Sequence, residues 1–180
     1  MIQIRIHGRG GQGVVTASEL IAIAAFADGR YSQAFPSFGV ERTGAPIESY
    51  TRIDSRPIRL REQIYNPDIL VILDASLLQV TDLSQGCGQE TRVIINTSKK
   101  KEKLKLQIPQ ENIYTINATQ IALDVIGKDI ANTVILGSFA KNTEEVSLSG
   151  LKKAVKQKFQ NKGQEIIKKN IQAIEKAYNY

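Results

Sequence analysis

Apolar and polar residues alternate over the first seven positions, where isoleucine occupies every second position from Ile2 to Ile6. This period-2 pattern predicts a β-strand. From Val14 onward the apolar residues recur at helical spacing until Gly29, where a helix is expected to end. Residues 8–13, four of which are glycine, therefore join a strand to a helix.

Later segments continue the alternation of strand and helix patterns. Strands are predicted at residues 31–36, 47–54, 68–73, 92–95 and 113–116. Helices are predicted at residues 120–126, 132–140, 148–159 and 164–178. The apolar run 68–73 is typical of a strand that is covered on both faces. The pattern indicates an α/β fold in a single domain spanning 1–180, of which residues 141–180 form a helical C-terminal part.

Short polar residues follow three of the predicted strands. Asp74, Asn96 and Asn117 each stand where a strand ends, and open α/β sheets bind ligands outside the carboxyl ends of their strands. Each of these residues on its own is more typical of a helix cap than of a ligand contact. Their clustering at one sheet edge with the glycine segment favours a ligand site.

The glycine segment is typical of an anion site, because the first N–H groups of a helix and the positive end of its dipole face the ligand. Gly8, Gly10 and Gly13 fit the dinucleotide pattern G-x-G-x-x-G. The second strand carries no acid for the ribose hydroxyls, however, and no Gly-Lys-Ser/Thr follows as in a Walker loop. Two interpretations stay open, a phosphate or diphosphate cradle and a turn that needs glycine for packing.

The segment 36–46 holds two prolines, two glycines, an aromatic residue and an adjacent acid–base pair. Exposed Phe38 and Arg42 would be typical of a contact loop. The alternative is a wide hairpin turn with Phe38 in the core.

Composition limits the chemistry of the chain. A single cysteine, Cys87, and a single histidine, His7, exclude a disulfide framework and argue against a zinc site, an iron–sulfur cluster or a histidine-based triad. No catalytic constellation stands out. No apolar run approaches the roughly 18 residues of a membrane helix, and the strand at the start leaves no room for a signal peptide. A cytoplasmic protein is expected.

The net charge of +6 is concentrated in lysine-rich segments. Residues 99–105 contain five lysines, and residues 141–180 contain nine, whereas all nine arginines precede residue 93. Such lysine runs are typical of solvated surface, and no aromatic residue or arginine is interleaved with them as in nucleic-acid binding. We therefore expect no nucleic-acid partner and look for the organised chemistry in the first half.

Two segments carry a family resemblance. Residues 8–18 (GRGGQGVVTAS) and 33–46 (QAFPSFGVERTGAP) closely resemble the gamma subunit of pyruvate:ferredoxin oxidoreductases, that is, the 2-oxoacid:ferredoxin oxidoreductase family. The resemblance extends through residues 57–59, 66–68 and 132–140 and covers essentially the whole chain. One departure from similar chains is Thr43, where basic residues are frequent.

The resemblance implies a three-layer α/β/α, Rossmann-like unit with a mostly parallel, mixed sheet and C-terminal helices. These enzymes oxidatively decarboxylate a 2-oxoacid with coenzyme A to an acyl-CoA and CO2, and they pass electrons to ferredoxin. Thiamine diphosphate and the iron–sulfur clusters belong to partner subunits (alpha, beta and delta), so the isolated chain is expected to hold no catalytic residue and no metal. The resemblance is closer to the pyruvate and branched-chain types, and pyruvate synthase is the expected activity.

The resemblance also suggests site residues. We expect the coenzyme A diphosphate at the glycine segment, and we expect a contact loop that faces the alpha and beta subunits. The residues expected at the diphosphate are Gly8, Arg9, Gly10, Gly11, Gln12, Gly13 and Thr16, and those of the loop are Phe38, Glu41 and Arg42. The competing hypothesis is a stand-alone nucleotide-binding Rossmann-like protein, which the missing ribose acid argues against.

Overall fold

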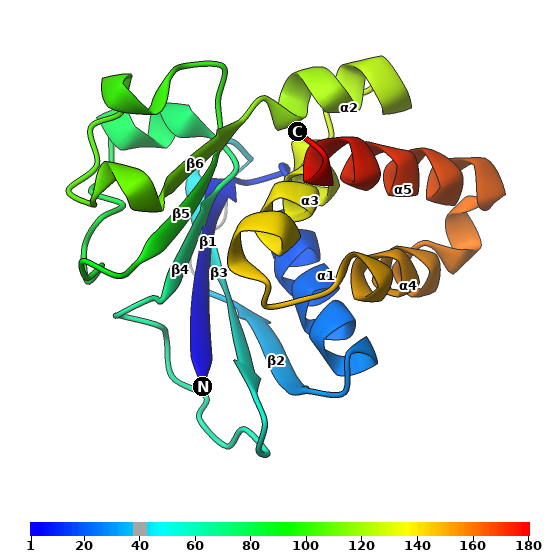
Figure 1. The fold of residues 1–180 in the computed structure, drawn as a ribbon, viewed down its shortest axis with the longest axis horizontal. Helices are drawn as coiled ribbons and strands as arrows, with labels where there is room; N and C mark the ends of the chain where they lie inside the picture. The colour runs from blue at the N-terminus through cyan, green and yellow to red at the C-terminus, as the bar shows by residue number, and fades with distance from the viewer. Residues whose placement is uncertain (38–42) are drawn as a thin grey trace.

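The computed structural model describes residues 1–37 and 43–180, and within them six strands form one sheet in the order β2-β3-β1-β4-β5-β6 (Figure 1). The strands are β1 (Ile2–Arg9), β2 (Tyr31–Pro36), β3 (Pro46–Asp54), β4 (Ile69–Ile72), β5 (Arg92–Asn96) and β6 (Ile113–Ile116). The helices are α1 (Val14–Ala27), α2 (Ala118–Ile126), α3 (Ala131–Thr143), α4 (Leu148–Lys158) and α5 (Gln164–Tyr178). Every predicted strand and helix is present, with ends shifted by at most a few residues.

The sheet is mixed, and most of its pairings are parallel. β1, β4, β5 and β6 run parallel to one another, whereas β3 is antiparallel to β1 and to the edge strand β2. This confirms the expected mostly parallel, mixed sheet. β2 and β3 pair as neighbours along the chain, which an antiparallel hairpin permits without a crossover helix.

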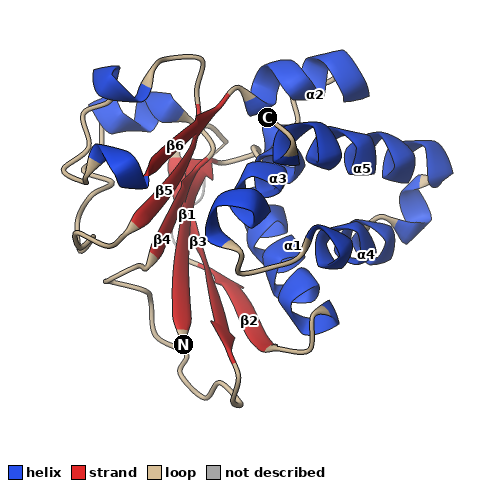
Figure 2. Ribbon diagram, viewed as in Figure 1, coloured by secondary structure: helices blue, strands red, loops and turns tan. Residues whose placement is uncertain are grey.

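The two faces of the sheet are covered differently, as Figure 2 shows. Within the described residues, the α-helices gather on one face, where α1 and α3 pack on the strands and α2, α4 and α5 pack on α1 and α3. The other face is covered by irregular segments and by the 3₁₀ helices η1 (Ala75–Gln79), η2 (Lys101–Lys103) and η3 (Gln110–Asn112). The crossovers after β4 and β5 lack a sustained helical apolar period, so they form short turns of helix.

β4 and β5 are buried on both faces. Val71 and Ile94 point into the core under the α-helices, and Ile72 and Ile95 point into a second core with Leu77 of η1. Such strands read as continuous apolar runs, as residues 68–73 do.

The connections after β1 and β4 leave the sheet on opposite faces. β1 continues into α1 on the helical face, whereas β4 continues into η1 on the other face. A crevice opens between two parallel strands at such a switch point, and open α/β sheets bind their ligands there.

Candidate functional site

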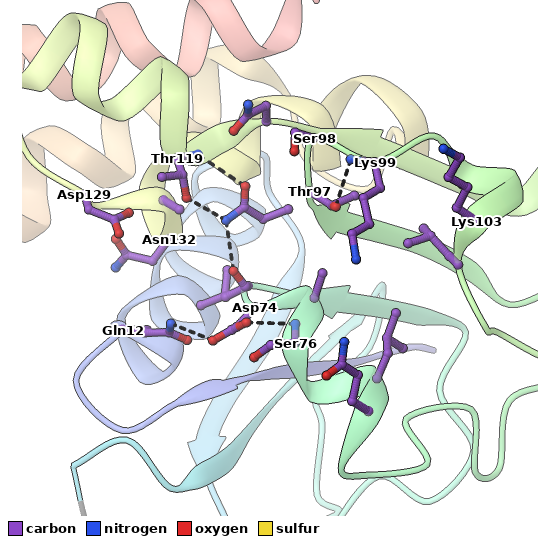
Figure 3. A pocket seen from close by; sticks show the side chains of 18 of the residues that line it. Gln12, Asp74, Ser76, Thr97, Ser98, Lys99, Lys103, Thr119, Asp129 and Asn132 are labelled. Carbon is purple, nitrogen blue, oxygen red and sulfur yellow. Dashed lines mark hydrogen bonds between the residues drawn. The ribbon is translucent and has the colours of Figure 1, made fainter.

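A pocket of about 920 Å³ lies at the carboxyl ends of β1, β4, β5 and β6 (Figure 3). Its walls come from Gly11 and Gln12 after β1, from residues 73–76, 78 and 79 after β4 and from residues 96–99 after β5. Residues at the starts of α2 and α3 and residues 103–105 complete it. The volume is in the range of small-molecule sites, about 300–1,000 Å³.

Asp74 ties the glycine segment to the end of β4. Its carboxylate accepts hydrogen bonds from the Arg9 Nε (3.0 Å), the Gln12 Nε2 (3.1 Å) and the Ser76 backbone N–H (2.9 Å). Partial burial raises the pKa of Asp74, but the hydrogen bonds from Ser76, Gln12 and Arg9 outweigh it and hold the pKa below its usual range. The carboxylate is therefore ionised, and its charge is largely neutralised within the chain.

Asn96 and Asn117 serve as local caps and ties while lining the pocket. Asn117 accepts a hydrogen bond from the Gln120 N–H and caps α2. The Asn96 Nδ2 donates to the Leu73 carbonyl (3.0 Å) and to the Thr119 Oγ1 (3.0 Å), which holds the ends of β4 and β5 against the start of α2. The two interpretations of these residues, cap and pocket wall, are therefore compatible.

Asn132, in the first turn of α3, is the most deeply buried polar group of the pocket. Its side chain is 6% exposed, and its Nδ2 donates to the Gly13 carbonyl at 3.2 Å. Its Oδ1 has no hydrogen-bond partner among the described residues. A buried acceptor without a donor is costly, so the geometry suits a ligand that brings an N–H or O–H group. The sequence pattern indicated only a buried helix at residues 132–140, and this role of Asn132 was missed.

Three lysines of the segment 99–105 are exposed, as expected of solvated surface, and they also form part of the pocket wall. Lys99, Lys103 and Lys105 line the pocket. Lys101 does not, and its Nζ donates to the Gln110 carbonyl at 2.8 Å. The expectation that the organised chemistry lies in the arginine-rich first half was therefore incomplete. Sequence alone could not find this feature, because the turns of η2 decide which lysines face inward.

The glycine segment is engaged more fully than expected. The Gly10 N–H donates to the Ala45 carbonyl (2.9 Å), and the Gln12 N–H donates to the Arg9 carbonyl (3.0 Å). The Arg9 N–H donates to the Gln12 Oε1 at 2.7 Å. Two of the amides around Gly10–Gly13, to which the diphosphate is assigned, are thus paired within the chain, and that assignment stays a prediction.

The other residues predicted around the diphosphate have different places. Gly11 and Gln12 line the pocket, whereas Gly8, Arg9, Gly10, Gly13 and Thr16 do not. A Cβ on Gly8 would lie 2.6 Å from the Val14 Cγ2, so the packing interpretation holds for that glycine. The Arg9 guanidinium is occupied by Asp74, by the Gly44 carbonyl and by the Ser76 hydroxyl. Phe38, Glu41 and Arg42 lie outside the described residues, so their predicted role as a contact loop stays a prediction.

The sheet order bears on the stand-alone dinucleotide hypothesis. In a dinucleotide-binding fold the second strand lies parallel to the first, and its end carries the acid for the ribose. Here β2 is antiparallel to β3 at the edge of the sheet, and β3 separates it from β1. The position from which such an acid would act is therefore absent from the described sheet.

The described residues hold no group of three or more histidine, cysteine, aspartate or glutamate side chains arranged to bind a metal ion. No helix in that part of the chain is long and apolar enough to cross a membrane.

Comparison with known proteins places this chain in a family. The family model described as "Pyruvate ferredoxin/flavodoxin oxidoreductase" matches residues 3–180. The chain is 49% identical over 156 residues to a pyruvate synthase subunit PorC of Methanosarcina barkeri, which covers 87% of this chain and 85% of the relative. It is 48% identical over 180 residues to the common gamma subunit of the pyruvate/ketoisovalerate oxidoreductases of Pyrococcus furiosus, covering 99% and 96% of the two chains.

Solved structures agree in fold. The pyruvate oxidoreductase subunit PORC of Thermotoga maritima superposes with a TM-score of 0.85 at 36% identity, over 99% of this chain and 95% of that one. A 2-oxoglutarate:ferredoxin oxidoreductase of Magnetococcus marinus, solved with 2-oxoglutarate, coenzyme A and succinyl-CoA bound, gives a TM-score of 0.78 at 21% identity. The match covers 99% of this chain and 30% of that larger chain, and it shows the fold alone.

Proposed function

The chain belongs to the pyruvate ferredoxin/flavodoxin oxidoreductase family as a gamma-type subunit, and from this premise we propose that its pocket binds coenzyme A. The enzyme it serves oxidises a 2-oxoacid within a multi-subunit complex. We propose pyruvate as that acid and alpha, beta and delta subunits as the partners. Thiamine diphosphate, the iron–sulfur clusters and the contact with ferredoxin are assigned to those partners.

The observation that carries the proposal is the composition of the pocket at the switch point. One wall holds Gly11 and the start of α3, where backbone N–H groups and the helix dipole favour an anion. The opposite part holds three lysines. Asn132 contributes a buried acceptor that lacks a donor among the described residues, and coenzyme A carries hydroxyl, amino and amide donors as well as phosphates.

In this proposal the residues of the chain bind and orient, and they do not react. The strand-end pocket holds the nucleotide part of coenzyme A, so that the thiol arm is free to extend toward a partner subunit. Thiamine diphosphate supplies the carbanion chemistry of decarboxylation when it is bound in the partners. Asp74 is not available as a base, because Arg9, Gln12 and Ser76 already hold its carboxylate.

The protein named a common gamma subunit in Pyrococcus furiosus serves oxidoreductases for both pyruvate and ketoisovalerate, according to its name. By analogy, we propose that partner subunits decide which 2-oxoacid reacts. The gamma-type chain then contributes the part of the site that every such reaction shares, namely coenzyme A.

A bulky substitution that fills the pocket tests the proposal. Ser98 is exposed and lines the pocket, so Ser98→Trp reduces the space for a ligand without disturbing the core. In a complex reconstituted with the thiamine-binding partners, we expect the KM for coenzyme A to rise about tenfold or more while the KM for pyruvate stays unchanged. Ser55→Trp, at an exposed position that does not line the pocket, is the matched control and should change neither constant.

An unchanged KM for coenzyme A in the Ser98→Trp complex would refute the pocket assignment. Failure of the wild-type chain to join a complex with its thiamine-binding partners on co-expression would refute the proposed partners.

A further inference from the structure

The lysine wall of the pocket points to a more specific recognition. We propose that Lys99, Lys103 and Lys105 bind a phosphate monoester of the ligand and that this group is the 3′-phosphate of coenzyme A. The inference rests on the proposed function and deepens it. It assigns to these three side chains the choice between coenzyme A and its 3′-dephospho form.

Only some lysines of a dense lysine run line the pocket. Residues 99–105 contain five lysines, and three of them line the pocket. Lys101 instead donates a hydrogen bond to a backbone carbonyl outside the pocket, at Gln110. The sole acid of the segment, Glu102, does not line the pocket. The local fold thus concentrates positive charge on one wall.

The positive charges of these three lysines are not neutralised by salt bridges within the described chain. None of the three lysines forms a salt bridge with a described residue, in contrast to Lys152, Lys158, Lys169 and Lys176 on the helices. Asp74, an acid that also lines the pocket, is held by Arg9 and Gln12. Figure 3 shows Asp129 and Asn132 at one end of the pocket and Lys103 at the other.

This separation gives the pocket a polarity. The end with Asp129 and Asn132 presents a carboxylate and a buried amide oxygen, which attract donor groups of a ligand. The lysine wall presents ammonium groups on flexible stems, which act as point charges toward phosphate. A phosphate monoester carries about −1.5 to −2 charges on one compact group, so several ammonium groups can converge on it. The bridging diphosphate carries its charge on two linked groups, and the backbone N–H groups at the helix starts suit it better.

Steady-state kinetics on the reconstituted complex test the inference. With the wild-type chain, we expect the KM for 3′-dephospho-coenzyme A to exceed that for coenzyme A by about tenfold or more. The triple variant Lys99→Gln, Lys103→Gln, Lys105→Gln should raise the KM for coenzyme A to the dephospho value. It should change the KM for dephospho-coenzyme A by less than about twofold.

A matched control removes the same charge elsewhere. Lys153, Lys156 and Lys162 are exposed and do not line the pocket, so their triple change to glutamine alters net charge equally and should leave both KM values unchanged. Equilibrium titration of the complex with adenosine 3′,5′-bisphosphate and with AMP gives a readout apart from activity. The lysine-wall variant should lose affinity for the bisphosphate only.

The outcomes distinguish the assignment of the 3′-phosphate from the assignment of the coenzyme A pocket. If the lysine-wall variant raises both KM values in the same proportion, or if the wild type does not discriminate between the two substrates, the 3′-phosphate assignment is wrong while the pocket assignment stands. If Ser98→Trp also leaves both KM values unchanged, the proposed coenzyme A site itself is wrong.

Discussion

At the scale of single residues, His7 is a buried ionisable group placed outside the pocket. Its side chain is 4% exposed, and its Nδ1 lies 3.6 Å from the Glu48 Oε1, while its Nε2 has no partner among the described residues. Burial lowers the pKa of His7 to about 4, although Glu48 acts in the opposite direction and Arg5 adds to the lowering. The imidazole is therefore neutral in the native protein at neutral pH.

The lowered pKa of His7 makes the free energy of unfolding depend on pH between about 6.5 and about 4. The unfolded chain takes up a proton on His7 near pH 6.5, whereas the native chain does so only near pH 4. The stabilisation that comes from the neutral His7 side chain is thus fully present above pH 6.5. It is lost as the pH falls through about 4, which lowers the free energy of unfolding by about 3 kcal/mol in total. Denaturant unfolding of wild type and His7→Gln between pH 7 and 4 measures it. The variant should lose much less stability over this range, and equal losses would contradict the assignment.

Gly13 shows why a strand-to-helix joint demands glycine. It adopts a φ of 75°, and an added Cβ would lie 2.2 Å from the Asn132 Nδ2. Both the left-handed backbone and the contact with α3 therefore oppose a side chain.

A pair of glycine substitutions separates these two costs. Gly29 has a φ of 81° with nothing within 4 Å of an added Cβ, so Gly29→Ala should cost about 1 kcal/mol of unfolding free energy, from the backbone alone. Gly13→Ala should cost about 2–4 kcal/mol, because overpacking against Asn132 adds to it. Urea unfolding measures both. Equal losses would show that Asn132 moves aside without cost.

At the scale of elements, α3 is the central helix of its layer. Residues 132–140 are buried throughout, and the helix packs against α5, α2 and α1 as well as against β5. The sequence predicted this helix from an apolar segment without a strong amphipathic face, which is typical of a helix covered on all sides. Gly137 is the point of closest approach to α5, where an added Cβ would meet the Ile174 carbonyl oxygen at 2.2 Å.

Substitution of Gly137 by alanine should change the free energy of unfolding in the direction opposite to that usual for a glycine inside a helix. Glycine to alanine inside a helix ordinarily stabilises by about 1 kcal/mol. Gly137→Ala should instead destabilise by about 2 kcal/mol or more, because α5 must move away from α3. Thermal unfolding compared with Gln157→Ala, an exposed position of α4, measures the effect. A stabilised Gly137→Ala variant would contradict the packing described here.

Strands and helices were predicted more reliably than the segments that connect them and the residues that they contact. Apolar runs and alternation located all six strands, and short polar residues located the strand ends at Asp74, Asn96 and Asn117, because both signals are local. The resemblance implied a layer on each face of the sheet, but the 3₁₀ helices that cover the second face were not predicted, because such short turns have no periodic signature. The partners of Gln12 and Asn132 are more than 60 residues away in sequence, so only the fold brings them together.

At the scale of the whole molecule, two lysine-rich regions serve different purposes. On the C-terminal helices, several lysines pair with acids of other elements, for example Lys158 with Glu19 of α1 and Lys176 with Asp124 of α2. The segment 99–105 instead contributes three exposed lysines to the lining of the pocket. The net charge of +6 therefore does not come from one basic patch with a single role. Composition alone could not distinguish the two lysine-rich regions.

The two faces of the sheet are covered differently, and this affects how the sequence of such a chain can evolve. The helical layer holds the large core, and alterations there propagate through α1, α3 and α5. The lysine wall belongs to a crossover that returns from β5 to β6 without any α-helix. Insertions and deletions in that crossover leave the helical layer in place. Ligand preference is thus free to diversify on one side of the molecule while the other side keeps the architecture constant.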